Sequence, residues 1–246
     1  MIPTITNLKQ SKDTITFDLE NCNPSLSNAL RRIIITEIPT ISFETNDYIN
    51  SSLKIIENTS SLTNELLLQR LGLIPIYFDT IKTYDPEKYK FILDIQNKGQ
   101  DIIDVTTKHF KIINLETNKE EDNSLFFKPN EITKDHLLLT RLKPSPNNEG
   151  EKILIEGKSV IGIGKTHIRY SPVSNVCFIN KKDPAKVQKA LEKYLIEHKE
   201  TGPIESLKKS FMLEEADFHY YTDENDDPYI FEFTIESCGV LEPKQI

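Results

Sequence analysis

Apolar residues recur at helical spacing in residues 23–38. Asn23 is the expected N-cap, and Pro24 suits the first helical position because its missing N–H costs nothing there. Pro39 predicts that the helix stops just before it, since the residue preceding a proline avoids the α region. One face carries an apolar stripe at i, i+3, i+4, i+7 and i+8 spacing, namely Leu26, Ala29, Leu30, Ile33 and Ile34. The spacing alone is also typical of ordinary core packing.

A second helix is expected to begin near Ser61 or Thr63. Its end is marked by Arg70 in the last turn, Gly72 at C′, the position after the C-cap, and Pro75 beyond. The sequence between the two helices is strand-like. Two helices of this kind contribute to the fold, but they do not identify a function.

Strands and further helices are predicted along the rest of the chain. Alternation of apolar and polar residues with a period of two indicates strands at residues 14–19, 41–43, 52–56, 89–95, 101–107, 110–115, 152–160, 173–179 and 229–235. Asp183 is expected to cap a third helix that ends before Gly202, and a shorter one follows at residues 204–211. Residues 116–123 and 143–151 are polar and rich in turn formers, so we expect exposed loops there.

Charge and composition narrow the class of protein. The 246 residues include 30 basic and 38 acidic ones, a net charge of −8, which argues against non-specific binding of nucleic acid. No apolar run reaches the roughly 20 residues of a membrane helix, and the first residues do not resemble a signal peptide. We therefore expect a soluble, intracellular protein. The three cysteines are widely spaced and predict neither a disulfide framework nor a zinc knuckle.

Candidate catalytic motifs are weak. Residues 162–166 read GIGKT, but a phosphate-binding loop needs a further glycine where this chain has Ser159, so nucleotide binding is disfavoured. The five histidines lie on separate predicted elements, and the acidic run at residues 224–227 lacks the pattern of a calcium loop. The residues thus favour a binding or structural protein. An enzyme that uses phosphate through the GKT sequence remains the alternative from the enzyme class.

Four segments together closely resemble the D/α family of RNA polymerase assembly subunits. The family comprises the archaeal D subunit, the third-largest subunit of eukaryotic polymerases and the amino-terminal domain of bacterial α. The segments occur in the family's order and span most of the chain: FDLENCNPSLSNALRRIIITEIPTISFE, NELLLQRLGLIPI, GIGKTHIRYSPVSNVCF and FTIESCGVLEP.

The resemblance implies an α+β fold with a discontinuous dimerisation domain, helices on a small antiparallel sheet, from residues 1–49 and 172–246, and an inserted β-rich domain at residues 50–171. It implies a non-catalytic assembly subunit of a multisubunit DNA-directed RNA polymerase that pairs with a smaller homologous subunit and contacts the second-largest and largest subunits. DNA would be approached only through the complex. The implied dimer interface is the apolar stripe named above. The implied large-subunit contacts are Arg31, Arg32, Glu37, Arg70, Gly164, Lys165 and His167.

No catalytic residue, metal or cofactor is expected in this chain, because the resemblance implies that the catalytic Mg²⁺ belongs to the large subunits. Some relatives carry a cysteine-rich metal-binding segment that residues 77–90 lack, so neither zinc nor an iron–sulfur cluster is expected. The family continues beyond the ESCGVLEP motif with a long interface helix, whereas this sequence stops at Ile246. That helix is either absent, part of a longer parent chain, or compensated by the partner.

The composition also gives an expectation about the source of the protein and its location in the cell. A cysteine-poor D-type chain rich in Asn, Ile and Lys is typical of a large cytoplasmic DNA virus, with an AT-rich eukaryote or an organelle-like plasmid as alternatives. The location would be the host cytoplasm or virion for a virus, and the nucleus for a cellular eukaryote. The alternative function is a free-standing protein–protein adaptor that reuses the polymerase dimerisation fold.

Overall fold

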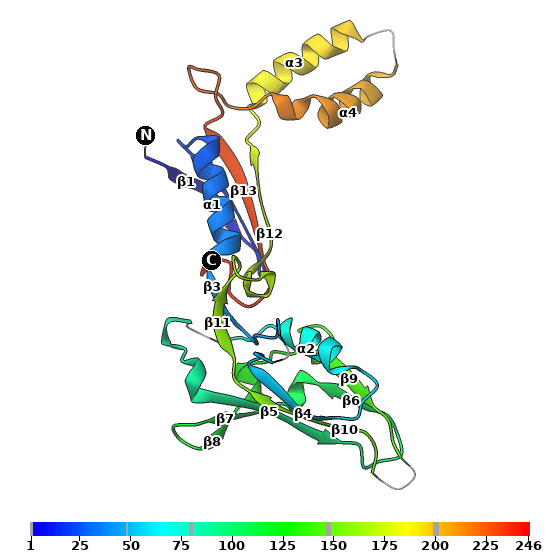
Figure 1. Cartoon of the computed structure of the whole chain (residues 1–246). Coiled ribbons are helices and arrows are strands. Elements are labelled where there is room, and N and C mark those ends of the chain that lie inside the picture. Colours follow the sequence, from blue (N-terminus) through cyan, green and yellow to red (C-terminus); the bar gives the residue numbers. More distant parts are fainter. Residues whose placement is uncertain (1, 48, 79–80, 146–148, 199–201) are drawn as a thin grey trace. The chain divides into compact units, whose positions relative to one another are not determined.

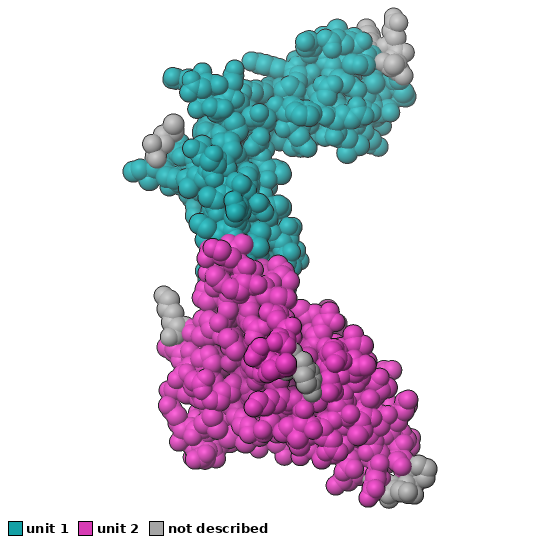
Figure 2. Space-filling model, in the orientation of Figure 1, with its two compact units in different colours: residues 1–35, 173–238, 242–246 teal, residues 36–172, 239–241 magenta. Residues whose placement is uncertain are grey.

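The computed structural model has an α+β fold and describes residues 2–47, 49–78, 81–145, 149–198 and 202–246. The chain forms two compact units (Figure 2). Unit 1 comprises residues 1–35, 173–238 and 242–246, and unit 2 comprises residues 36–172 and 239–241. Unit 1 is therefore built from both ends of the chain. These units divide the chain at other positions than the predicted domains, whose assignment stays a prediction.

Unit 1 contains a four-stranded antiparallel sheet in the order β1-β2-β13-β12. Its strands are β1 (Thr4–Gln10), β2 (Thr14–Glu20), β13 (Ile230–Ser237) and β12 (Val173–Asn180). In the sheet register Phe17 lies opposite Phe233, which lies opposite Phe178 on the far side. The three rings stack in a row with centroids 5.2 Å apart in each pair, so this face of the sheet carries the apolar core of the unit.

Helix α1 (Pro24–Thr36) follows β2 and runs alongside the strands of unit 1 (Figure 1). Asn23 caps it as predicted, because its Oδ1 atom accepts a hydrogen bond of 2.8 Å from the Leu26 N–H. The buried residues of the helix are Ser27 and Ile34. The helix thus contributes one side to the core of unit 1.

Helices α3 (Pro184–Glu197) and α4 (Ile204–Glu214) form an antiparallel pair between β12 and β13 (Figure 1). Asp183 caps α3 as predicted, accepting from the N–H groups of Ala185 at 2.9 Å and Lys186 at 3.4 Å. The pair has a small core of its own, formed by Tyr194, Leu207, Phe211 and Ala216.

Unit 2 is built on a five-stranded antiparallel sheet in the order β4-β10-β5-β7-β8. These strands are β4 (Leu53–Asn58), β10 (Lys152–Gly157), β5 (Tyr89–Gln96), β7 (Lys111–Asn114) and β8 (Lys119–Glu121). Two further antiparallel pairs join β3 (Pro39–Ser42) to β11 (Val160–Ile163) and β6 (Ile103–Thr106) to β9 (Leu138–Leu142). Helix α2 (Asn64–Gly72) packs its Leu67, Leu68 and Leu71 into a core rich in phenylalanine.

Single 3₁₀ turns complete the described elements: η1 (Ile81–Thr83), η2 (Pro86–Lys88), η3 (Thr107–His109), η4 (Asn123–Leu125), η5 (Ile168–Tyr170) and η6 (Ala216–Phe218). Among the described residues, no helix combines the length and the apolar character needed to cross a bilayer.

Several local predictions were wrong or incomplete. Strands β1, β8 and β9 were not predicted, and β8 with η4 replaces the loop expected at residues 116–123. The single strand expected at residues 152–160 is divided into β10 and the first residue of β11. Gly72 is the last residue of α2 and not C′, and Gly239 is the one described glycine with a positive φ, of 91°. Part of the loop expected at residues 143–151, residues 146–148, lies outside the described residues. The three-residue β8 has no apolar residue, so its pairing with β7 and not an apolar pattern holds it in place.

Candidate subunit-contact surfaces

Helix α1 presents an apolar side that nothing covers in the described part of unit 1. Leu26 and Ile33 are 45% and 51% exposed, Ala29 is exposed, and Leu30 is half-buried. We call these four residues the α1 face. Ile34, the fifth residue predicted for the dimer interface, is only 5% exposed and belongs to the core of unit 1.

The α1 face has the character of a contact surface. Leu26 and Ile33 are seven residues apart and therefore share one side of the helix, whereas the buried Ser27 and Ile34, also seven apart, share the side turned inward. Burying a leucine or isoleucine side chain contributes about 1.5–3 kcal/mol. Contiguous apolar side chains left in water thus carry a cost that a partner would remove.

In unit 2, the segment after β11 forms a tight loop that holds three predicted contact residues, Gly164, Lys165 and His167. The Thr166 N–H and hydroxyl both donate to the Ile163 carbonyl, at 3.0 and 2.8 Å. The Lys165 N–H donates to the Thr36 carbonyl at 2.9 Å, which ties the loop to the backbone just before Glu37. We call residues 164–168 the motif loop. The exposed side chain of Lys165 extends from a backbone fixed at both sides.

Arg169, which the sequence reasoning did not single out, organises this region. Its Nη1 donates to the Phe43 carbonyl at 2.9 Å and to the Thr45 hydroxyl at 2.5 Å, and its Nη2 donates to the Asn46 side chain. Its Nε and its backbone N–H both donate to His167 Nδ1, each at 3.1 Å. One planar guanidinium thereby joins the motif loop to the segment after β3. We call these five residues the Arg169 cluster.

Two glycines make room for this arrangement. A Cβ on Gly72 would lie 2.4 Å from Arg169 Nη1 and 2.2 Å from Thr45 Oγ1, and a Cβ on Gly162 would lie 2.7 Å from the Tyr170 ring. Both glycines are therefore required for close packing and not for an unusual backbone angle. Through Gly72, the end of α2 lies directly against the Arg169 cluster.

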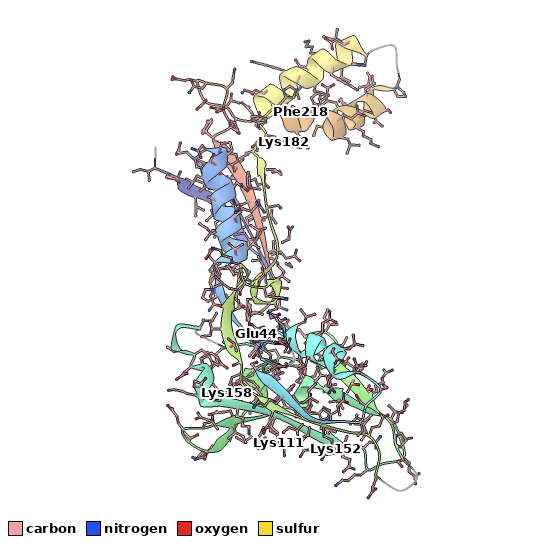
Figure 3. All side chains as sticks on the ribbon, viewed as in Figure 1. Glu44, Lys111, Lys152, Lys158, Lys182 and Phe218 are labelled. Carbon is pink, nitrogen blue, oxygen red and sulfur yellow. The ribbon has the colours of Figure 1, made fainter. Side chains whose placement is uncertain are left out.

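Burial and charge set the protonation of two groups here. Burial lowers the pKa of His167, the Arg169 charge lowers it further, and Glu44 acts in the opposite sense. Burial also raises the pKa of Tyr170, and its hydrogen bond to Glu44 adds to this. The Tyr170 hydroxyl donates to Glu44 Oε2 at 2.9 Å (Glu44 is labelled in Figure 3). Both His167 and Tyr170 are thus neutral at pH 7.

The other predicted contact residues are dispersed. Arg31, half-buried, donates to Asn28 Oδ1 at 3.2 and 2.9 Å, and Arg32 is exposed; both belong to unit 1. Glu37 is exposed in unit 2, where Arg70 donates to the Leu138 carbonyl at 2.8 Å. The structure therefore brings Gly164, Lys165 and His167 together with the residue that precedes Glu37. The assignment of all seven as contacts stays a prediction.

The described residues give little support to metal binding or nucleotide binding. Within the described ranges, no group of three or more His, Cys, Asp or Glu side chains is arranged to hold a metal ion. The GKT sequence lies on the turn after β11 and is followed by a single 3₁₀ turn, Ile168–Tyr170. A phosphate-binding loop instead opens an α-helix whose N-terminus faces the anion. The enzyme alternative built on GKT therefore lacks its structural context.

Comparison with known proteins gives a family. Residues 16–246 match the model of the RNA polymerase Rpb3/Rpb11 dimerisation domain. A conjugation stage-specific protein of Tetrahymena thermophila is 32% identical over 185 residues, 69% of this chain and 56% of that protein. The mouse DNA-directed RNA polymerases I and III subunit RPAC1 is 26% identical over 200 residues, 70% of this chain and 52% of that subunit.

An archaeal relative extends the comparison. The DNA-directed RNA polymerase subunit Rpo3 of Methanocaldococcus jannaschii is 28% identical over 152 residues, 62% of each chain. The chain spans about half the length of the Tetrahymena and mouse proteins that it matches.

Proposed function

The chain belongs to the RNA polymerase Rpb3/Rpb11 dimerisation-domain family, and from this membership we propose that it is a non-catalytic assembly subunit of a multisubunit DNA-directed RNA polymerase. Relatives of comparable similarity in a mammal and an archaeon bear the names of polymerase subunits, which supports this proposal. Nucleotidyl transfer and its Mg²⁺ would belong to the large subunits. The chain would act inside the cell, and DNA would be approached through the assembled complex.

The observation that carries the proposal is the α1 face. A helix that leaves Leu26, Ala29 and Ile33 exposed while it packs Ser27 and Ile34 inward has a second side suited to a partner. We assign the partner on that side as a smaller homologous subunit, which would bring a matching helix to the α1 face. The motif loop of unit 2 would contact the second-largest subunit.

The proposal is tested by co-expressing the chain with the smaller homologous subunit and the second-largest subunit encoded in the same genome. A ternary complex that survives size-exclusion chromatography is expected. Ile33→Asp should prevent pairing with the smaller subunit, because a carboxylate would be buried without a partner charge. Since Ile33 is 51% exposed in the isolated chain, the variant should fold normally.

Ile102→Asp is the matched control. Ile102 is 61% exposed, lies outside the helices and strands, and belongs to unit 2. Its complex should form as with the unaltered chain. An unaltered chain that stays alone with both subunits present would refute the proposal. A chain that pairs with other proteins but never appears in purified transcription complexes would instead indicate an adaptor.

A further inference from the structure

His167 has its two ring nitrogens in different situations. Nδ1 accepts hydrogen bonds from the Arg169 backbone N–H and from Arg169 Nε, each at 3.1 Å. A nitrogen that accepts two N–H groups carries no proton, and in the neutral imidazole the proton is then on the other nitrogen. Arg169 therefore fixes the tautomer of His167 with the proton on Nε2.

The Nε2–H group is the one left for a partner. Within the part of the chain that the structure describes, it has no hydrogen-bond partner, and it is not among the buried unpaired side-chain atoms. The imidazole as a whole is half-buried. Its ring is thus held firmly from the inside and offers a single donor on the outside.

Lys165 adds a charge two residues before this donor in the sequence. Its side chain is exposed, and among the described residues its ammonium makes no hydrogen bond or ion pair. Its backbone is fixed through the bond of its N–H to the Thr36 carbonyl. The motif loop therefore combines one oriented neutral donor with one cation two residues away.

We propose that Arg169 is a positioning residue for partner contact, and that the group it orients, His167 Nε2–H, donates to a carboxylate of the second-largest subunit, with the Lys165 ammonium as the neighbouring cation. This inference rests on the proposed function and adds the chemistry of the contact. A carboxylate accepts from a neutral N–H and pairs with an ammonium at the same time, so both groups of the loop would be satisfied.

A nucleic-acid phosphate is the competing acceptor, and the observations favour it less. A phosphate backbone is bound by several cations that displace counterions, whereas the chain has a net charge of −8 and the loop offers one lysine and a neutral imidazole. The contact is thus suited to one acidic side chain. Competition by DNA is kept as an outcome of the test.

The tautomer is tested first, in the isolated chain. The ¹⁵N chemical shifts of the five histidines, with His167 assigned by its loss in His167→Asn, should show a protonated Nε2 and an unprotonated Nδ1 at pH 7. Arg169→Ala removes the Nε donor but keeps the backbone N–H of residue 169, so the preference for the Nε2–H tautomer should weaken without being lost completely. A protonated Nδ1 in the unaltered chain would overturn the inference, whatever the chain binds.

Binding is tested with two variants, each of which keeps the hydrogen-bonding role of only one of the two ring nitrogens. His167→Asn keeps an acceptor near the position of Nδ1 and removes the outer donor, whereas His167→Gln keeps a donor of similar reach and loses the inner acceptor. Measured against the purified second-largest subunit, the Asn variant should bind about tenfold more weakly, the loss of roughly one charge-assisted hydrogen bond. The Gln variant should bind better than the Asn variant yet unfold at a lower urea concentration.

The proposal predicts that the two variants rank in opposite orders: the Gln variant binds more tightly, and the Asn variant is more stable. A merely structural role of His167 would make binding follow stability, with the Asn variant the better of the two in both. Lys165→Met should reduce the salt dependence of binding, whereas Lys111→Met, an exposed lysine of β7 that is labelled in Figure 3, should not.

The remaining outcomes separate the possible failures. If the unaltered chain does not bind the second-largest subunit while its tautomer is as expected, the proposed function fails. If it binds and His167→Asn binds equally well, only the present inference fails. If a short DNA duplex displaces the subunit and Lys165→Met abolishes the binding of that duplex, the acceptor is a phosphate and the assignment of a carboxylate is wrong.

Discussion

Replacing Gly72 with alanine should destabilise unit 2 through Arg169. The new Cβ would lie 2.4 Å from Arg169 Nη1, 3.2 Å from its Cζ and 2.2 Å from Thr45 Oγ1, and Cβ atoms do not approach other heavy atoms below 3.0 Å. The Thr45 hydroxyl can rotate away, but the guanidinium can clear the methyl group only by leaving its position. We therefore expect the Arg169 cluster to open.

The magnitude follows from the hydrogen bonds that would be lost. Arg169 Nη1 donates to the Phe43 carbonyl and to the Thr45 hydroxyl, and each such bond from a charged donor contributes about 1.5–3 kcal/mol, at the low end here because Arg169 is half-buried. Losing both costs about 3 kcal/mol. Replacing glycine with alanine at a position of compatible backbone conformation stabilises by about 0.4–1 kcal/mol, so the net loss is about 2 kcal/mol.

A double-mutant cycle in urea tests this reasoning. The chain contains no tryptophan, so unfolding is followed by circular dichroism and tyrosine fluorescence. Gly72→Ala and Arg169→Ala should each destabilise, but in the Arg169→Ala background the alanine at 72 should be neutral or stabilising by up to about 1 kcal/mol. Costs that simply add, or a single Gly72→Ala variant as stable as the unaltered chain, would refute the role given to Gly72.

Three further predictions concern single side chains. Burial raises the pKa of Tyr84 to about 12, so its contribution to stability is complete below pH 10 and is lost as the pH rises through 12, by up to about 3 kcal/mol. Between pH 8 and 11 about half of this, roughly 1.4 kcal/mol, should be lost in urea unfolding, and Tyr84→Phe should lack that loss. Burial opposes ionisation of Asp18, but Lys181 and Asn7 lower its pKa overall. The stability that the Asp18 carboxylate contributes is therefore present above the ordinary carboxyl pKa and is lost as the pH falls through the lowered pKa. Asp18→Asn should remove that acid dependence when unfolding is followed by circular dichroism. Asp183→Ala should cost about 1 kcal/mol by removing the α3 cap, with Asp183→Asn as the control that keeps it, both measured by urea unfolding.

Local signals in the sequence predicted local structure well. Asn23 and Asp183 cap their helices as expected, because a cap depends on atoms two or three residues away. The alternating apolar runs became strands for the same reason, since period-two patterning is a property of the segment itself. The family resemblance went further, because it anticipated the α+β fold and the family, neither of which periodicity alone could identify.

Arg169 could not be found in this way. Its partners Phe43, Thr45 and Asn46 lie 126, 124 and 123 residues before it, and no spacing rule relates such distant positions. Gly72 carried a signal, but the signal had two meanings: a glycine at the end of a helix is typical of C′, and here it makes room for a guanidinium. Only the packed structure distinguishes the two.

Helix α1 shows why periodicity predicted the apolar stripe but not which of its residues are buried and which are exposed. On an ideal helix with 3.6 residues per turn, taking Leu26 as zero, Ala29 and Ile33 lie at about −60° and −20°, and Leu30 and Ile34 at about 40° and 80°. The three residues between −60° and 0° are exposed, Leu30 is half-buried, Ile34 is buried, and Ser27, near 100°, is completely buried. The centre of the apolar stripe is therefore displaced from the centre of burial by roughly a quarter of a turn.

A helix that served only its own sheet would have its apolar stripe centred on the buried side. In α1 the displacement leaves the larger part of the stripe facing away from the core of unit 1, with Leu30 at the border between the two sides. A charge at Leu30 would therefore disturb the fold together with the proposed partner contact. A charge at Ile33 would disturb the proposed contact alone, and for this reason Ile33→Asp is the variant that separates assembly from folding.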